Sequence, residues 1–135
     1  MTSLSFKNVL ISALFIWSIG LMGLIGSYFF SLIPNAAQQS IWLQSIVLIP
    51  AALIGAHLYY RRGLTANGFL LGTSIMLVMI GLDIILKIPA FLLPYGIGWG
   101  AYFSDFNYWL LGIEVVTVVA AYWQIERALQ KVQAQ

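Results

Sequence analysis

The stretch NVLISALFIWSIGLMGLIGSYFFSLIPNAAQQSIWLQSIVLIPAALIGAHLYY, residues 8–60, contains no Asp, Glu, Lys or Arg. A membrane-crossing helix needs about 20 apolar residues. The stretch is therefore too long for one span and long enough for two. The turn formers Pro and Asn, followed by two Gln, divide it within residues 31–40. We predict two membrane helices, over residues 9–30 and 41–60.

The rest of the chain contains two further apolar runs. Thr65 or Asn67 can cap a third helix over residues 66–88, which is expected to stop where a proline follows it. A connection over residues 89–107 holds two prolines, three glycines and many aromatic residues. A fourth helix is predicted over residues 108–125, and a short polar tail follows it.

The composition agrees with a membrane protein. Of the 135 residues 61% are hydrophobic and 7% are charged, against roughly 25% charged residues in an average soluble domain. The mean hydropathy is +0.94. These values exclude a soluble domain, a disordered tail and a nucleic-acid binder, which needs a basic face. We therefore predict an all-α, polytopic membrane protein in which residues 1–135 form one four-helix transmembrane bundle.

The basic residues predict the orientation of the bundle. Cytoplasmic loops are enriched in Lys and Arg. If the N-terminus is cytoplasmic, one basic residue, Lys87, falls on the outer side and five fall inside: Lys7, Arg61, Arg62, Arg127 and Lys131. The prediction is therefore N-in and C-in, with residues 89–107 as an outer aromatic loop. The first helix is expected to be an uncleaved anchor, because its apolar run exceeds that of a secretory signal.

Three charged residues fall inside the predicted spans, where a charge costs about 2.5–3.5 kcal/mol on insertion scales. Asp83 lies near the outer end of the third helix, and Glu114 lies near the outer end of the fourth. At about 1.5 Å per residue both carboxylates sit roughly 8–9 Å below the outer boundary. Lys87 follows Asp83 by four residues and shares its helix face. We therefore expect the three side chains to form one cluster.

Small and polar residues at helical spacing mark contacts between helices in lipid. On this basis the predicted inward faces are Gly20, Gly23 and Ser27 in the first helix and Gln44, Ala51 and Gly55 in the second. Those of the third and fourth helices are Gly72, Met76, Met79, Asp83 and Lys87, and Asn107, Glu114, Thr117, Ala121 and Gln124.

The charged cluster has two main interpretations. It can be a structural ion-pair network in which Lys87 neutralises one carboxylate and Glu114 bonds to Gln44, Thr117 or a tyrosine. It can instead be a ligand-binding or proton-coupling site, because two carboxylates and one lysine leave an unbalanced negative charge. Contact with a partner helix is a third interpretation.

Eight aromatic residues lie in or beside the outer loop: Phe91, Tyr95, Trp99, Tyr102, Phe103, Phe106, Tyr108 and Trp109. Rings at headgroup depth commonly form an aromatic belt. Their density, together with the prolines and glycines, also suits a folded lid over the acidic cluster. The candidate ligand-binding residues are therefore Asp83, Lys87, Glu114, Gln44, Trp99, Tyr102 and Trp109, and a small cationic or lipid-like ligand would suit them.

Enzyme signatures are missing from the sequence. It has no cysteine, no phosphate-binding glycine loop, no nucleophile elbow and no zinc-binding helix motif. We therefore predict no catalytic set, no metal site and no cofactor. The expected partners are the lipid bilayer and a second copy of the chain or another membrane protein.

A family resemblance rests on the second half of the chain, on Leu82-Asp83, Pro89, Pro94, Tyr102-Phe103, Tyr108-Trp109, Glu114 and Tyr122-Trp123. This pattern resembles small bacterial four-helix membrane proteins of unknown function, which implies a multi-pass protein of the bacterial inner membrane. The chain does not resemble the small multidrug resistance exporters, whose essential Glu lies in the first helix. With the sterol-isomerase-like EXPERA family it shares only a layout of four helices and paired acidic residues under aromatics.

Three functions remain open on this evidence. The first is a protein that binds a small molecule or lipid in the outer half of the bundle, or that acts as an accessory membrane subunit. The second is a small proton- or cation-coupled transporter or channel that uses Asp83 and Glu114. The third is a lipid-modifying enzyme with the two carboxylates as acid and base, which requires both to face one cavity.

Overall fold

The computed structural model describes residues 5–29, 34, 36–63 and 66–134. The elements are α1 (Phe6–Phe29), α2 (Ala36–Tyr60), α3 (Gly68–Leu82), the π-helix η1 (Asp83–Leu92), the 3₁₀ turn η2 (Leu93–Tyr95), α4 (Trp99–Ser104) and α5 (Phe106–Gln133). Four helical stretches are long and apolar enough to cross a membrane: Phe6–Ser27, Gln38–Tyr60, Gly68–Leu92 and Phe106–Gln133. The predicted all-α, four-span bundle is confirmed.

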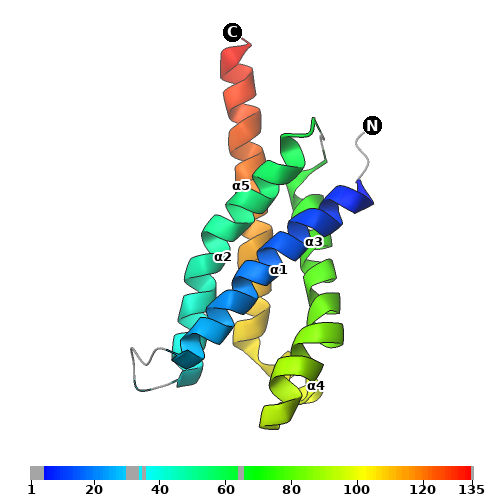
Figure 1. Ribbon diagram of the computed structural model, residues 1–135. Coiled ribbons are helices and arrows are strands. Elements are labelled where there is room, and N and C mark those ends of the chain that lie inside the picture. Colours follow the sequence, from blue (N-terminus) through cyan, green and yellow to red (C-terminus); the bar gives the residue numbers. More distant parts are fainter. Residues whose placement is uncertain (1–4, 30–33, 35, 64–65, 135) are drawn as a thin grey trace.

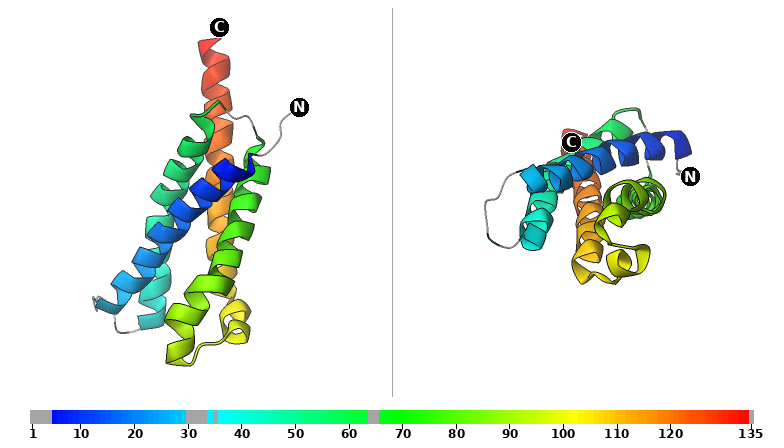
Figure 2. Two further views of the ribbon diagram at one scale, coloured as in Figure 1. Left: turned by 45° about the vertical axis from the view of Figure 1, so that its right-hand side comes forward. Right: turned by 60° about the horizontal axis from the view of Figure 1, so that its bottom comes forward.

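The four spans alternate in direction, so the N- and C-terminal ends lie at the same end of the bundle (Figures 1 and 2). In Figure 1 and in the left view of Figure 2 the last turns of α5 project beyond the other helices. The opposite end carries η1, η2 and α4, in the place of the predicted outer loop (Figure 1). Adjacent termini fit the N-in, C-in prediction, whose assignment to the cytoplasm stays a prediction.

The start of α2 differs from the predicted position. The helix begins at Ala36, five residues before the predicted residue 41, and the predicted break falls partly outside the described residues. Sequence reasoning assigned the glutamines of this region to water. Gln39 is instead buried, and its Nε2 donates to the carbonyl of Ser27 at 3.1 Å. A buried amide with a backbone partner does not need water, so α2 extends through the predicted turn.

Side chains cap the N-terminal ends of α3 and α5. Asn67 Oδ1 accepts from the backbone N–H of Phe69 at 2.8 Å and of Leu70 at 3.4 Å. It is therefore one of the two predicted caps, and Thr65 lies outside the described residues. Asp105 caps α5 in the same way, because its Oδ1 accepts from the N–H of Asn107 at 2.9 Å.

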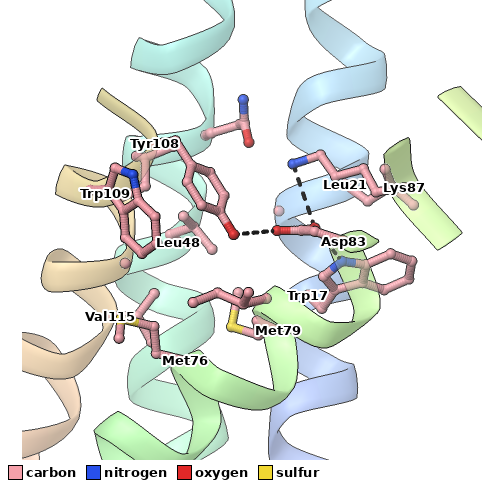
Figure 3. A pocket seen from close by; sticks show the side chains of 15 residues that line it. Trp17, Leu21, Leu48, Met76, Met79, Asp83, Lys87, Tyr108, Trp109 and Val115 are labelled. Atoms are coloured by element: carbon pink, nitrogen blue, oxygen red, sulfur yellow. Dashed lines mark hydrogen bonds and ion pairs between the residues drawn. The ribbon is translucent and has the colours of Figure 1, made fainter. Parts of the chain in front are cut away.

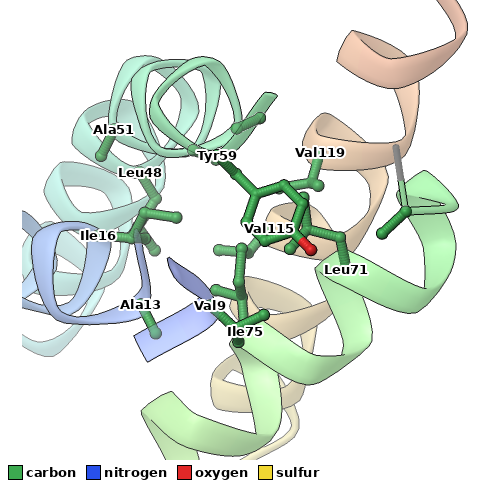
Figure 4. Packing of buried hydrophobic residues seen from close by; sticks show 13 residues of the cluster. Val9, Ala13, Ile16, Leu48, Ala51, Tyr59, Leu71, Ile75, Val115 and Val119 are labelled. Atoms are coloured by element: carbon green, nitrogen blue, oxygen red, sulfur yellow. The ribbon is translucent and has the colours of Figure 1, made fainter. Parts of the chain in front are cut away.

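The buried apolar core lies in the half of the bundle that holds the chain ends. The largest fully buried side chain is Tyr59 of α2, which sits among residues of all four spans (Figure 4). The core consists of Val9, Ala13, Ile16, Leu48, Ala51, Ala52, Ala56, Tyr59, Ala66, Leu71, Ile75, Val115 and Val119. The alanines let α1 and α2 approach closely, and a Cβ on Gly55 would lie 2.6 Å from Ile16 Cδ1. This close packing of small residues is what joins helices in lipid.

A glycine pair joins α3 to α5. Gly68 and Gly72 are four residues apart, and both face α5 closely. A Cβ on Gly68 would lie 2.6 Å from Trp123 Cβ, and a Cβ on Gly72 would lie 3.0 Å from Val116 Cα. Sequence reasoning placed Gly72 on the inward face but missed the pair. The four-residue spacing of glycines, GFLLG, was the available signal.

The third span does not stop where it was expected to stop. It continues past Pro89 as the π-helix η1 to Leu92. Proline clashes with the carbonyl four residues before it in an α-helix. Membrane helices tolerate it through local 3₁₀ or π adjustments, which is the geometry seen here. The predicted loop over residues 89–107 is therefore mostly helical, and left-handed Gly96 (φ 81°) turns the chain toward α4.

Candidate functional site

The Asp83 carboxylate is the centre of a buried polar network (Figure 3). Its Oδ1 accepts from Trp17 Nε1 of α1 at 2.8 Å. Its Oδ2 accepts from the hydroxyl of Tyr108 of α5 at 2.8 Å and from that of Tyr102 of α4 at 3.3 Å. Both oxygens are thus satisfied by neutral donors. Hydrogen bonds from neutral groups therefore stabilise the Asp83 carboxylate, and its oxygens do not need a hydrogen bond from a cation.

Lys87 lies one helical turn beyond Asp83 and is also buried, with 7% of its surface exposed. Its Nζ is 3.9 Å from Asp83 Oδ1, which is an ion pair but too long for a hydrogen bond. The same Nζ donates to the Tyr102 hydroxyl at 2.8 Å and lies 5.2 Å from the centre of that ring. An ammonium has three N–H donors. Of these, one is used in the contacts of the described residues.

Two cavities meet at this network. The inner cavity, of about 50 Å³, is lined by Trp17, Met76, Met79, Asp83 and Tyr108 among others (Figure 3), and it has room for water. The outer cavity, of about 320 Å³, reaches the lower end of the ligand-pocket range of roughly 300–1,000 Å³. The residues that line both are Gln44, Lys87, Tyr108 and Leu111.

The wall of the outer cavity is mostly apolar. Leu24, Ile41, Leu92, Ile97, Ala101 and Leu111 line it. The charged residues in this wall are the buried Lys87 and the exposed Asp105, and Asp83 is not part of it. A buried positive group in an apolar cavity suits a molecule that has one acidic group and an apolar body.

The short helix α4 contributes Tyr102 to the wall of the outer cavity. The Tyr102 ring contacts the Tyr108 ring at 4.4 Å between centroids and the Phe103 ring at 5.3 Å. Burial raises the pKa of the Tyr102 phenol, and the nearby Asp83 carboxylate raises it further. The phenol therefore remains a hydrogen-bond donor to Asp83 at neutral pH.

The two predicted tryptophans have different positions. Trp109 lines the inner cavity, and its Nε1 donates to the carbonyl of Phe103 at 2.8 Å. Trp99 lines neither cavity, and its Nε1 donates to the carbonyl of Ile84 at 3.2 Å, which ties α4 to η1. Gln44 lines both cavities and donates to Ser40 Oγ at 3.1 Å.

Glu114 does not join the cluster that the sequence predicted. It lines neither cavity. Its Oε2 accepts from Ser45 Oγ of α2 at 2.6 Å, and not from the predicted Gln44, Thr117 or a tyrosine. The predicted equal depth of the two carboxylates did not bring them together: Glu114 contacts α2, whereas Asp83 of η1 contacts α1, α4 and α5. Depth alone did not determine direction.

The predicted inward face of the fourth helix was also wrong. Thr117 and Ala121 are exposed, whereas Val115, Val119 and Ala120 are buried. Thr117 Oγ1 donates to the carbonyl of Ile113, one turn back in its own helix, at 2.8 Å. A hydroxyl satisfied in this way can face lipid, so its polarity did not mark a helix contact.

Sequence reasoning missed two residues of the site, Trp17 and Tyr108, as partners of Asp83. Trp17 is the one residue of its helix with an indole N–H, and residues 8–29 around it carry no charged side chain. A buried indole N–H requires an acceptor, and this requirement was the available signal.

Comparison with family models, curated proteins and solved structures finds no match to the chain. The fold and the site themselves define the class: this is a multi-pass helical membrane protein with a buried charged network beside a cavity of ligand size.

Proposed function

We propose that the protein binds an amphipathic molecule with an acidic group in the outer cavity. The acidic group would meet the Lys87 ammonium, and the apolar body would lie against Leu24, Ile41 and Leu92. The observation that carries this proposal is the position of Lys87. Lys87 lines a cavity of about 320 Å³, while the neighbouring carboxylate already accepts three hydrogen bonds from neutral donors.

The distribution of charge favours an acidic ligand over the cationic ligand considered from sequence. Asp83 lies outside the wall of the outer cavity, so a cation there would meet Lys87 first. The Tyr102 ring, a candidate surface for a ligand cation, already has Lys87 at 5.2 Å from its centre. Asp105 is exposed to solvent at the rim, where water and salt screen its charge.

A binding role is also favoured over acid–base catalysis. An isomerase-like mechanism needs both carboxylates in one cavity, and Glu114 lines neither. An accessory subunit that holds such a molecule for a partner, or a homo-oligomer that does so, agrees with the same geometry.

The proposal places the protein in a bacterial inner membrane with its chain ends in the cytoplasm. The five basic residues predicted to be cytoplasmic support this orientation, and the resemblance supports the compartment. In that orientation the outer cavity lies in the outer half of the bilayer, where an acidic lipid or a single-chain amphiphile can enter.

Native mass spectrometry of the protein, extracted gently from its own membrane, tests the proposal. The wild type should retain an acidic amphiphile, and Lys87→Gln should lose it because the ammonium is gone. Ala101→Phe should also lose it, because the new ring fills part of the cavity. Lys131→Gln, which removes an exposed lysine of α5, is the matched control and should keep the ligand.

A wild-type protein without a ligand, or with lipids that both cavity variants retain equally, would contradict the proposal. The same spectra report whether the chain is a monomer, a homo-oligomer or part of a complex.

A further inference from the structure

Glu114 has an unusual environment for a carboxylate in a membrane span. Its Oε2 accepts from Ser45 Oγ of α2 at 2.6 Å. Its Oε1 is buried and has no hydrogen-bond partner among the described residues. The side chain as a whole is partly exposed, between α2 and α5. One oxygen is thus stabilised and the other is not.

The charged and titratable groups on the neighbouring helices do not compensate this oxygen. Asp83, at the end of the third span, is bonded to Trp17, Tyr102 and Tyr108. On α2 and α5 the next ionisable side chains form a separate chain, in which His57 Nδ1 lies 2.9 Å from the Tyr122 hydroxyl and that hydroxyl donates to Glu126 at 3.0 Å. Tyr122 is eight residues beyond Glu114, which is about 12 Å along a helix.

We propose that Oε1 of Glu114 is a proton-binding site at the α2–α5 contact, independent of the outer cavity. An unpaired negative oxygen in an apolar surrounding is costly, and a positive charge relieves that cost. Ser45 holds the other oxygen and so orients the carboxyl group. The bound proton sits on the unpaired oxygen and leaves when water reaches it.

The ligand set favours a proton over a metal ion. Calcium takes six to eight oxygen ligands and magnesium demands six. Glu114 and Ser45 together supply three oxygens. Within the described part of the chain, His, Cys, Asp and Glu do not gather in a group of three. A proton, in contrast, needs one lone pair.

Asp83 offers an internal comparison. Both carboxylates lie in membrane spans, but the oxygens of Asp83 accept three hydrogen bonds and have Lys87 beside them. Both oxygens of Asp83 therefore have hydrogen-bond donors, whereas Glu114 has one on Oε2 alone. The two groups should differ in any reaction that requires a protonated carboxyl.

Dicyclohexylcarbodiimide provides that reaction, because this apolar reagent enters membranes and modifies protonated carboxyl groups. The full-length protein in lipid nanodiscs is treated at a series of pH values, and the modified peptides are identified by mass spectrometry. We expect adducts on Glu114, decreasing as the pH is raised, and none on Asp83. Glu114→Gln should abolish the adduct, and Thr117→Ala, one turn away, should leave it unchanged.

Three results would overturn the proposal. One is the absence of a Glu114 adduct at every pH in the folded wild type, which needs no variant to be stable. Another is modification of Asp83 to the same extent. The third is protection of Glu114 by sodium chloride but not by choline chloride at constant pH, which would assign the site to an alkali cation. None of these results depends on the ligand of the outer cavity.

Discussion

The hydroxyl of Tyr108 donates to Asp83 Oδ2 at 2.8 Å and joins the third span to α5. The other oxygen of the same carboxylate accepts from Trp17 of α1 at 2.8 Å. One buried side chain therefore connects three of the four spans. Because the hydrophobic effect does not drive helices together within lipid, such a connection contributes directly to the stability of the bundle.

The two members of the Asp83–Lys87 pair should differ in their contribution to stability. Asp83→Asn should lower the free energy of unfolding in detergent by about 3–5 kcal/mol, because it leaves Lys87 buried without a counter-charge. Its amide nitrogen would also replace one of the two acceptor oxygens, and so would face the donor of either Trp17 or Tyr108. Lys87→Met should cost less, about 1–3 kcal/mol, because three neutral donors still hold the carboxylate.

Unfolding in mixed detergent micelles, followed by circular dichroism, measures both values. An equal loss in the two variants, or a greater loss in Lys87→Met, would show that the neutral donors do not stabilise Asp83 as described.

The contact of α3 with α5 should depend on Gly72. A Cβ at this position would lie 3.0 Å from the Cα of Val116 and 3.1 Å from its carbonyl oxygen. Because backbone atoms cannot rotate away, Gly72→Ala should lower the free energy of unfolding by about 1–3 kcal/mol.

Gly81→Ala in the same helix is the matched control. A Cβ there has no atom within 4 Å, and alanine is the better helix former, so this change should be neutral or stabilising by up to about 1 kcal/mol. Equal effects in the two variants would mean that the close helix contact is absent.

Alkaline pH should lower the free energy of unfolding through the titration of Tyr102. Burial raises the pKa of this phenol in the folded protein, and Asp83 raises it further, whereas the unfolded chain has the ordinary value of about 10. The stabilisation is therefore complete below pH about 10 and is lost as the pH rises beyond it, because only the unfolded chain releases the proton.

Tyr102→Phe removes this group. Its free energy of unfolding should fall less steeply between pH 10 and 11 than that of the wild type. Parallel curves for the two proteins would show that Tyr102 titrates alike in the folded and unfolded states.

Much of the fold could be predicted from sequence because membrane spans follow from apolar length alone. The uncharged stretch of residues 8–60 is too long for one span, and the structure divides it into α1 and α2. Local geometry was harder to predict. The π-helix of η1 lets the third span pass Pro89, and the carbonyl of Ser27 lets Gln39 enter the bundle. Both depend on contacts that residue types do not encode.

The candidate site could be predicted only in part, for a related reason. Asp83 and Lys87 were found because intramembrane charge is rare and four-residue spacing places side chains on one face. Glu114 was assigned to the same cluster from its depth. Its direction around α5 depends on the packing of Val115 and Val119 in the core, which its polarity did not reveal.

The central claim is that an acidic amphiphile binds in the outer cavity with its acidic group at Lys87. The most direct test is photocrosslinking in nanodiscs with a fatty acid that has a diazirine on its chain, followed by mapping of the adducts by mass spectrometry. We expect adducts on the cavity residues Leu92, Ile97 and Leu111, and their loss in Lys87→Gln. Adducts confined to exposed apolar residues such as Leu77 and Ile113, and equal in both proteins, would contradict the claim.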